Sequence, residues 1–328
     1  MNKKSIFFTF TAILMVSVIV LAFTSQTYVT MKNRIAVTKH RVQLANNYIN
    51  SIESIYLKRA LYATGYRALY AMAMDINKTG SPSESPLFFD NKENFEQNFQ
   101  SAILKAEIRG SESGIMKGKT IIDTLKILEN LSQDAYHINT TFEKNPDKIK
   151  VVVFQNDKTG PWQVGVNMSI SYFVDADLAE WNISSQVIEA VFSISGLDDP
   201  MYMFNTGKVF TNHINQAPFK TWNITNLNAS IINRTYKYDS KVPNFLMRFY
   251  NDNSQSLCCG IESLVYPEIL KVQPTLDKGN SFVDCAYWGG GCGEGRLFNI
   301  TGITHYPDYP FRLDFDHVIS YNVADKTY

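Results

Sequence analysis

The chain has 328 residues, and its 31 Lys plus Arg balance its 31 Asp plus Glu, so the formal net charge is zero. This balance argues against a nucleic-acid-binding protein, which would carry a basic surface, so we expect no nucleic acid among its partners. Hydrophobic residues make up 45% of the chain and aromatic residues 13%. Such a composition is typical of a packed globular protein with a tendency toward β-structure.

The N-terminus has the pattern of a membrane anchor. Residues 1–5 include Lys3 and Lys4, and residues 6–23 contain no charge, glycine or proline. A run of about 18 apolar residues is long enough to cross a bilayer as a helix. We therefore expect a cytoplasmic tip (1–5), a transmembrane segment in membrane lipid (6–23), and an extracytoplasmic remainder, in a single-pass cell-membrane protein. A cleaved signal peptide has the same opening pattern and is the alternative.

Residues 24–80 predict a long amphipathic stalk helix that continues the transmembrane segment. Apolar or aromatic residues recur every seven positions, with a companion row three residues later that contains one charge. A sustained heptad pattern of this kind is typical of a coiled coil. The apolar stripe must be covered either by neighbouring copies or by the head of the same chain. The main row consists of Tyr28, Ile35, Val42, Ile49, Tyr56, Ala63 and Tyr70.

The remaining chain predicts a helical section and then a β-rich domain. In the loop and helical section 81–147, apolar residues have a 3.6-residue period over 92–108 and 117–137, which indicates two shorter helices. From residue 148 onward the pattern alternates with a period of two, as in strands. The fold class is therefore α+β, with an antiparallel sheet or sandwich-like head over 148–328. Predicted strands are 149–155, 162–173 and 181–194, followed by 230–238, 245–250 and 311–321.

Four cysteines lie within 35 residues of one another, at Cys258, Cys259, Cys285 and Cys292. An even number in an oxidising compartment indicates two disulfides. Adjacent side chains of a strand point in opposite directions, so we expect Cys258 and Cys259 each to pair with Cys285 or Cys292. A zinc site is the alternative, but the usual Cys-x(2–4)-Cys spacing is absent.

Acceptor tripeptides for N-glycosylation are unusually frequent, with nine in the chain. Each has the form Asn-x-Ser/Thr with no proline at x, and such sites lie on the surfaces of exported proteins. We therefore expect a glycoprotein surface. The acceptors are Asn77, Asn130, Asn139, Asn167, Asn182, Asn223, Asn228, Asn233 and Asn299.

Motifs for catalysis are absent from the sequence. There is no His-Glu-x-x-His metalloprotease motif and no Gly-x-Ser-x-Gly nucleophile elbow. Asp314 and Asp316 lie two residues apart and would share one face of a strand, so they are weak candidates for a hard cation. We expect no cofactor and no catalytic residues. The four tryptophans are expected mainly in the core or at interfaces.

The layout of residues 1–80, with a charged tip, one apolar segment and an uninterrupted amphipathic helix that precedes a β-rich head, resembles type IV pilins and pilin-like proteins. The resemblance implies a helix that anchors each subunit and then packs in a filament core. The stretches 195–200 and 258–265 are similar to uncharacterised archaeal membrane-anchored surface proteins. We therefore expect a non-catalytic structural or interaction protein, a cell-surface subunit that contacts its own copies or other surface subunits through the stalk. An extracytoplasmic module that binds a glycan, peptide or ion is the alternative, and an anchored enzyme is a further one.

Overall fold

A computed structural model describes residues 38–78, 88–177, 179–207, 209–272, 279–289, 292–293, 295–306 and 310–328. Within these residues no helix is both long and apolar enough to cross a bilayer. This finding overturns the predicted single-pass membrane anchoring and the cell-membrane location that followed from it. The segment on which the prediction depended, 6–23, lies outside the described residues, as does the first part of the predicted stalk.

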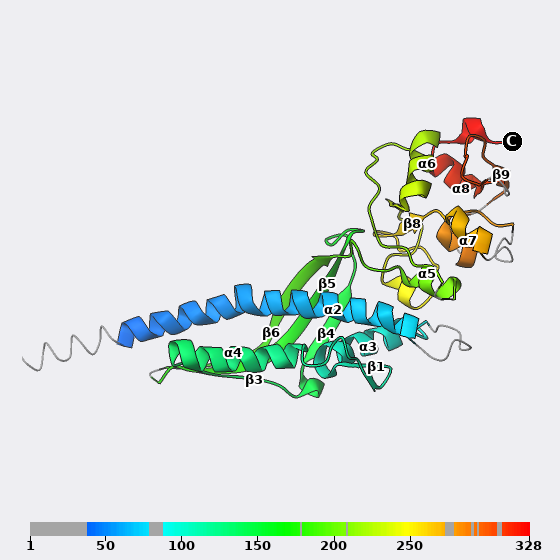
Figure 1. The fold of residues 1–328 in the computed structure, drawn as a ribbon. Coiled ribbons are helices and arrows are strands. Elements are labelled where there is room, and N and C mark those ends of the chain that lie inside the picture. Colours follow the sequence, from blue (N-terminus) through cyan, green and yellow to red (C-terminus); the bar gives the residue numbers. More distant parts are fainter. Residues whose placement is uncertain are drawn as a thin grey trace, which may run out of the picture.

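The described stalk is one long helix that contains a π-helical turn. Residues 38–51 are α-helical, the turn spans Ile52–Tyr56, and α2 spans Leu57–Lys78. In Figure 1 this helix lies across the sheet as the longest element of the molecule. Its buried side chains pack on the same chain, including Ala45, Ile52 and Leu61. The head of the chain therefore covers one apolar side of this helix.

The π turn changes which side of the long helix is buried. A π turn holds one more residue than an α turn, so every later position is displaced by one around the helix axis. Tyr56, Ala63 and Tyr70, on the predicted heptad row, accordingly lie exposed, whereas the next residue in each case, Leu57, Thr64 or Ala71, is buried. The prediction of a helix is correct here, but beyond residue 52 the main heptad row is exposed, and only Ala73 of the companion row is buried.

Two shorter helices follow, close to their predicted positions. The Asn91 side chain accepts a hydrogen bond from the Asn94 amide at 2.9 Å and caps α3. Thr120 and Asp123 form a reciprocal capping box at the start of α4. A short ribbon separates the two helices, and a 3₁₀ turn follows them. The bounds are α3 Lys92–Lys105, β1 Glu107–Ile108, β2 Ser111–Glu112, α4 Ile121–Tyr136 and the turn Pro146–Lys148.

An antiparallel sheet of four strands forms the centre of the molecule. Strand β5 pairs along one edge with β6 and along the other with β3 and β4, one after the other. The alternate residues of β5 are buried because helices α2, α3 and α4 cover that face of the sheet (Figure 1). The opposite face carries exposed residues such as Val187. The strands are β3 Asn139–Phe142, β4 Lys150–Phe154, β5 Gln163–Asp175 and β6 Glu180–Ser193.

A glycine allows the long helix to approach the sheet closely. A Cβ atom at Gly65 would lie 2.9 Å from Cε1 of Phe192 and 3.2 Å from Cγ2 of Val166. Both neighbours are buried in the core, so neither can move away freely. Gly65 is therefore required for packing, although glycine is a poor helix former.

The C-terminal part is mostly short helices and two-stranded ribbons around a second apolar core. The prediction of a continuous β-rich head is therefore wrong beyond residue 194. A helix that Asn223 caps occupies the first residues of the expected strand 230–238. A second helix, which Asp314 caps, lies within the expected strand 311–321. A 3₁₀ turn, Met247–Phe249, replaces the expected strand 245–250. The elements are α5 Pro200–Asn205, α6 Ile224–Asn233, β7 Tyr236–Tyr238, β8 Ile261–Ser263, α7 Pro267–Val272, β9 Leu297–Asn299, β10 Arg312–Asp314 and α8 Phe315–Ser320.

Aromatic contacts join this part to the helix–sheet body. The rings of Phe88 and Phe204 stack with centroids 3.7 Å apart. The Phe89 amide donates to the Phe249 carbonyl at 3.0 Å. In Figure 1 the C-terminal part, coloured yellow to red, lies beyond one end of the sheet near the C-terminal end of α2. The helix–sheet body thus contacts the C-terminal part through these aromatic residues.

Candidate functional site

Strands β7 and β8 separate two polar clusters in the C-terminal part. Their register places Tyr236 opposite Ser263 and Lys237 opposite Glu262. Because successive side chains of a strand point to opposite faces, each pair belongs to a different side of this ribbon. Tyr236 and Ser263 contribute to one cluster, and Lys237 and Glu262 contribute to the other.

The arginine cluster consists of Arg248, Asp199, Asp284, Tyr236 and Ser263. Arg248 is fully buried, and its Nη1 lies 2.6 Å from Oδ2 of Asp199 and 2.9 Å from Oδ2 of Asp284. The Tyr236 hydroxyl donates to Asp199 at 2.8 Å, and the Ser263 hydroxyl donates to Asp284 at 2.8 Å. Nearly every polar group therefore has a partner inside the fold.

The arginine cluster has a structural role. Burial raises the pKa of Asp199 even though Arg248 acts in the opposite direction. Burial alone would lower the pKa of Arg248, but Asp199 and Asp284 outweigh it and raise that pKa. None of its five residues lines the α8 wall cavity around Asp316 and Ser320, the cavity between α4 and β3, or the small one beside Asp75. It joins the segments of Asp199, Tyr236, Ser263 and Asp284 around the guanidinium of Arg248.

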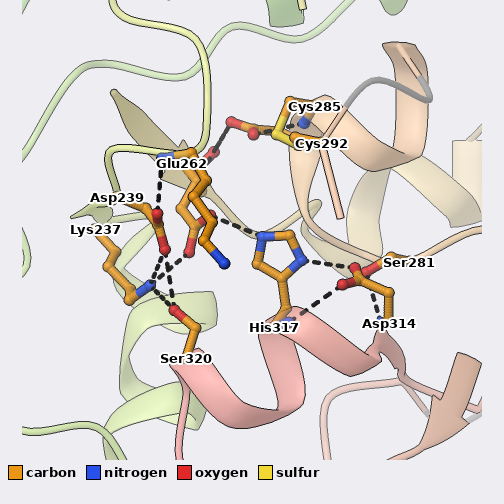
Figure 2. Close-up of polar contacts among 12 residues, drawn as sticks. Lys237, Asp239, Glu262, Ser281, Cys285, Cys292, Asp314, His317 and Ser320 are labelled. Carbon is orange, nitrogen blue, oxygen red and sulfur yellow. Dashed lines mark hydrogen bonds and ion pairs between the residues drawn. A yellow bond between two sulfur atoms is a disulfide. The ribbon is translucent and has the colours of Figure 1, made fainter. Parts of the chain in front are cut away.

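The histidine cluster consists of Lys237, Asp239, Glu262, Asp314 and His317 (Figure 2). His317 lies between two carboxylates, with Nδ1 2.6 Å from Oδ2 of Asp314 and Nε2 3.0 Å from Oε2 of Glu262. The Lys237 ammonium donates to Glu262 at 3.0 Å and to Asp239 at 3.1 Å. Three carboxylates and two cations thus form one connected network that is nearly all buried.

The network keeps its cations protonated. Burial alone would lower the pKa of His317, but the carboxylates of Glu262 and Asp314 raise it to about 10. Burial likewise opposes the charged form of Lys237, yet Glu262 and Asp239 raise its pKa. The pKa of Glu262 is lowered despite its full burial, because Lys237 and His317 lie against it.

Acid–base catalysis needs a group that this network does not supply. A histidine acting as general base must be neutral and must present a free ring nitrogen, whereas both nitrogens of His317 contact carboxylates. Ser320 donates to Asp239 and accepts from Lys237, which places a hydroxyl beside an amine. The raised pKa of Lys237 keeps that amine protonated, so it does not activate the hydroxyl.

A cavity of about 580 Å³ lies beside this network. It is lined by residues of α8 and by the segment 239–242 together with Gln255. Gly293 also lines it, with φ +91°, and a Cβ there would lie 2.6 Å from a carboxylate oxygen of Asp314. Pockets of roughly 300–1,000 Å³ accommodate small organic ligands. We call this space the α8 cavity.

The α8 cavity contains two charged groups without partners. Asp239 and His317 belong to the histidine cluster, but Asp316 and Lys241 make no ion pair or side-chain hydrogen bond among the described residues. Phe315 and Ile319, one helical turn apart on α8, are 51% and 56% exposed. The cavity therefore offers one free carboxylate, one free ammonium and an apolar strip.

The structure separates the predicted cation pair. Asp314 ends β10, caps α8 and contacts His317, whereas Asp316 lies in the first turn of α8 on the cavity. Their expected common strand face does not exist, because the chain changes from strand to helix between them. The described residues include no group of three or more His, Cys, Asp or Glu suited to a metal ion.

All four cysteines are disulfide-bonded, but not in the expected pairs. Cys258 bonds to Cys259, and Cys285 bonds to Cys292 with a Cα–Cα distance of 5.8 Å. The expectation assumed a strand at 258–259. The chain instead bends there, with Leu257 at φ +65°, so the argument from opposite faces does not apply.

The predicted glycosylation acceptors differ in exposure. The side chain of Asn77 lies outside what the structure describes. Asn228 is engaged, because its Nδ2 donates to the carbonyl oxygens of Ile224 and Gly302 at 3.1 and 2.8 Å. Five acceptors are exposed, and Asn167 and Asn299 are half-buried like Asn228. The exposed ones are Asn130, Asn139, Asn182, Asn223 and Asn233.

A second cavity of similar volume, between α4 and β3, is less suited to a charged ligand. Its charged groups include Glu129, which pairs with Lys144 at 2.9 Å. Asp177, also on its wall, pairs with Arg41 at 2.5 Å. These ion pairs would have to break before either group could bind a ligand.

Sequence reasoning missed most of the residues that build the site. Lys237, Asp239 and Glu262 belong to no motif, and their spacing in the chain is large. One signal was present, since Glu262 stands among Ile261, Leu264 and Val265, and a charge that is buried with such residues needs a partner. The four tryptophans are all half-buried and pack against the two cores.

Comparisons with family models, with curated proteins and with solved structures find no match to this chain. The argument for function therefore depends on the geometry alone.

Proposed function

We propose that this chain is a non-catalytic binding protein whose ligand site is the α8 cavity. The observation that carries the proposal is the combination of unpaired Asp316 and Lys241 on a cavity with an otherwise satisfied polar floor. Unpaired charges beside a concave surface are groups that a ligand can satisfy. The enzyme alternative has less support, because neither His317 nor Lys237 is available as a base.

The walls of the cavity are held in place before any ligand arrives. Lys237, on β7, bonds to Ser320 at the end of α8, and Ser320 donates to Asp239 on the opposite wall at 3.1 Å. The segment 239–242 is in turn bonded to the chain at 256–260 through backbone hydrogen bonds. A preorganised site loses less conformational entropy on binding, which favours recognition.

A ligand screen followed by matched variants tests the proposal. The purified chain is screened by thermal shift against small polar compounds, and hits are titrated by calorimetry. We expect at least one hit that D316N or K241Q weakens. D134N and K150Q remove exposed charges elsewhere and serve as controls. Hits that all four variants bind alike, or a screen without hits, would refute the proposed site.

A second candidate function is self-association through the outer face of the long helix. Ile55, Tyr56, Tyr62 and Tyr70 of this helix are 38–48% exposed, and the Tyr62 ring also has an edge contact with Phe192 at 5.8 Å between centroids. Ile55 and Tyr62 are seven residues apart and Tyr56 and Tyr70 are fourteen apart, and multiples of seven are the spacing by which helices of separate copies pack. Self-association also agrees with the subunit role that the pilin resemblance implies.

Sedimentation velocity over a hundredfold range of concentration tests this second function. We expect association that Y62S/Y70S abolishes and that a double substitution of exposed residues on another helix, such as D134N/Q133S on α4, leaves unchanged. A monomer at every concentration would count against it.

A further inference from the structure

The two unpaired charges of the α8 cavity have opposite signs and come from different segments of the chain. Asp316 is half-buried on α8, and Lys241 belongs to the facing segment 239–242. The other charged groups on the cavity, Asp239 and His317, are already satisfied by the histidine cluster. A ligand that satisfies both free groups carries a cation at one end and an anion at the other.

The apolar strip adds a third requirement. Phe315 and Ile319 both line the cavity and are more than half exposed, so an apolar group of the ligand would gain by covering them. A volume of about 580 Å³ falls in the range that holds a ligand larger than one amino acid. Phosphate-bearing ligands fit poorly, because two of the four charged lining groups are carboxylates.

We infer that the α8 cavity binds a short zwitterionic peptide of two or three residues. Its α-ammonium contacts Asp316, its α-carboxylate contacts Lys241, and an apolar side chain lies on Phe315 and Ile319. This inference rests on the proposed binding function and names the class of ligand. The peptide is bound without chemistry, and its free termini are the groups that are recognised.

Calorimetry with blocked and unblocked forms of one tripeptide tests this inference. The probe is leucyl-alanyl-leucine, titrated into the full chain beside its N-acetylated and its C-amidated forms. We expect saturable binding of the free tripeptide and a loss of about fivefold for each blocked form, which corresponds to an ion pair at a partly exposed site. Equal binding of the three forms, or no binding of the free form, would overturn the inference.

Variants assign each terminus to its residue. In D316N, N-acetylation is expected to have no further effect while amidation still weakens binding, and in K241Q the pattern is reversed. D134N is expected to behave as the unmodified chain. If the two variants respond identically to both blocking groups, the assignment of the termini is wrong.

The result also separates this inference from the proposed function. If the tripeptide fails but a compound of another class binds in a manner that requires Asp316 or Lys241, the ligand class is wrong and the binding site stands. If no compound binds in that manner, both fail.

Discussion

The substitution H317Q should remove a pH-dependent part of the folding stability. His317 is charged in the native state, with its pKa raised to about 10 by Glu262 and Asp314. In the unfolded chain the pKa of histidine is about 6.5. A group whose pKa is higher in the folded state stabilises fully below the unfolded pKa, and this stabilisation is lost as pH rises through the folded pKa. The relevant window is therefore about pH 6.5 to 10.

The size of the effect follows from the same two pKa values. The difference corresponds to at most about 5 kcal/mol at low pH, because one pKa unit is about 1.4 kcal/mol. The contribution of His317 to the free energy of unfolding is then about 4 kcal/mol near pH 7 and about 1.5 kcal/mol near pH 9. Leaving Glu262 and Asp314 buried without the cation between them gives a similar figure of about 3–5 kcal/mol.

Urea unfolding at pH 7 and pH 9 measures this contribution. We expect the difference in unfolding free energy between the natural chain and H317Q to shrink by about 2–3 kcal/mol between the two conditions. H213Q is the matched control, since His213 is exposed and its bond to Asp198 is worth less than about 1 kcal/mol. A difference between natural chain and H317Q that is equal at both pH values would refute the reasoning.

Three further predictions concern packing, buried charge and the disulfides. G65V should destabilise the chain by about 1–3 kcal/mol through overpacking, whereas A63V on the exposed side of the same helix should change stability by less than about 1 kcal/mol; equal effects in urea unfolding would contradict the close approach. R248M should cost about 3–5 kcal/mol because it leaves two buried carboxylates without their cation, and a thermal midpoint near that of the natural chain would disprove it. Cleavage between Cys285 and Cys292 should leave the fragments joined until a reductant is added, and the double serine variant should lose about 2–3 kcal/mol; fragments that separate without reductant would rule out this bond.

The parts of the fold that local patterns determine were predictable. Helices α3 and α4 follow from 3.6-residue periodicity and a capping residue, and strands β4 and β5 follow from alternation on either side of the turn 156–161. The buried face of the long helix was not predictable beyond residue 52. A heptad pattern assumes a continuous α-helix, and one π turn displaces all later positions.

The candidate site was less predictable, because long-range pairing builds it. Glu262 and His317 are 55 residues apart, and Lys237 and Ser320 are 83 apart. No local pattern specifies which buried carboxylate will face which cation. The prediction at Asp314 and Asp316 identified the right segment but the wrong geometry. Asp314 is an N-cap with an extended backbone, so it resembles a strand residue unless the helix that follows it is also predicted.

The two clusters give the ribbon β7–β8 a specific role. A ribbon of three residues on each strand is too short to be stable alone. Here the side chains of two of its three residue pairs are fixed by polar contacts, with Tyr236 and Ser263 held on the arginine side and Lys237 and Glu262 on the histidine side. A register slip of one residue would move each side chain to the opposite cluster and leave charges without partners on both sides. The arginine cluster therefore fixes the register on which the floor of the α8 cavity depends, although it lines no part of that cavity itself.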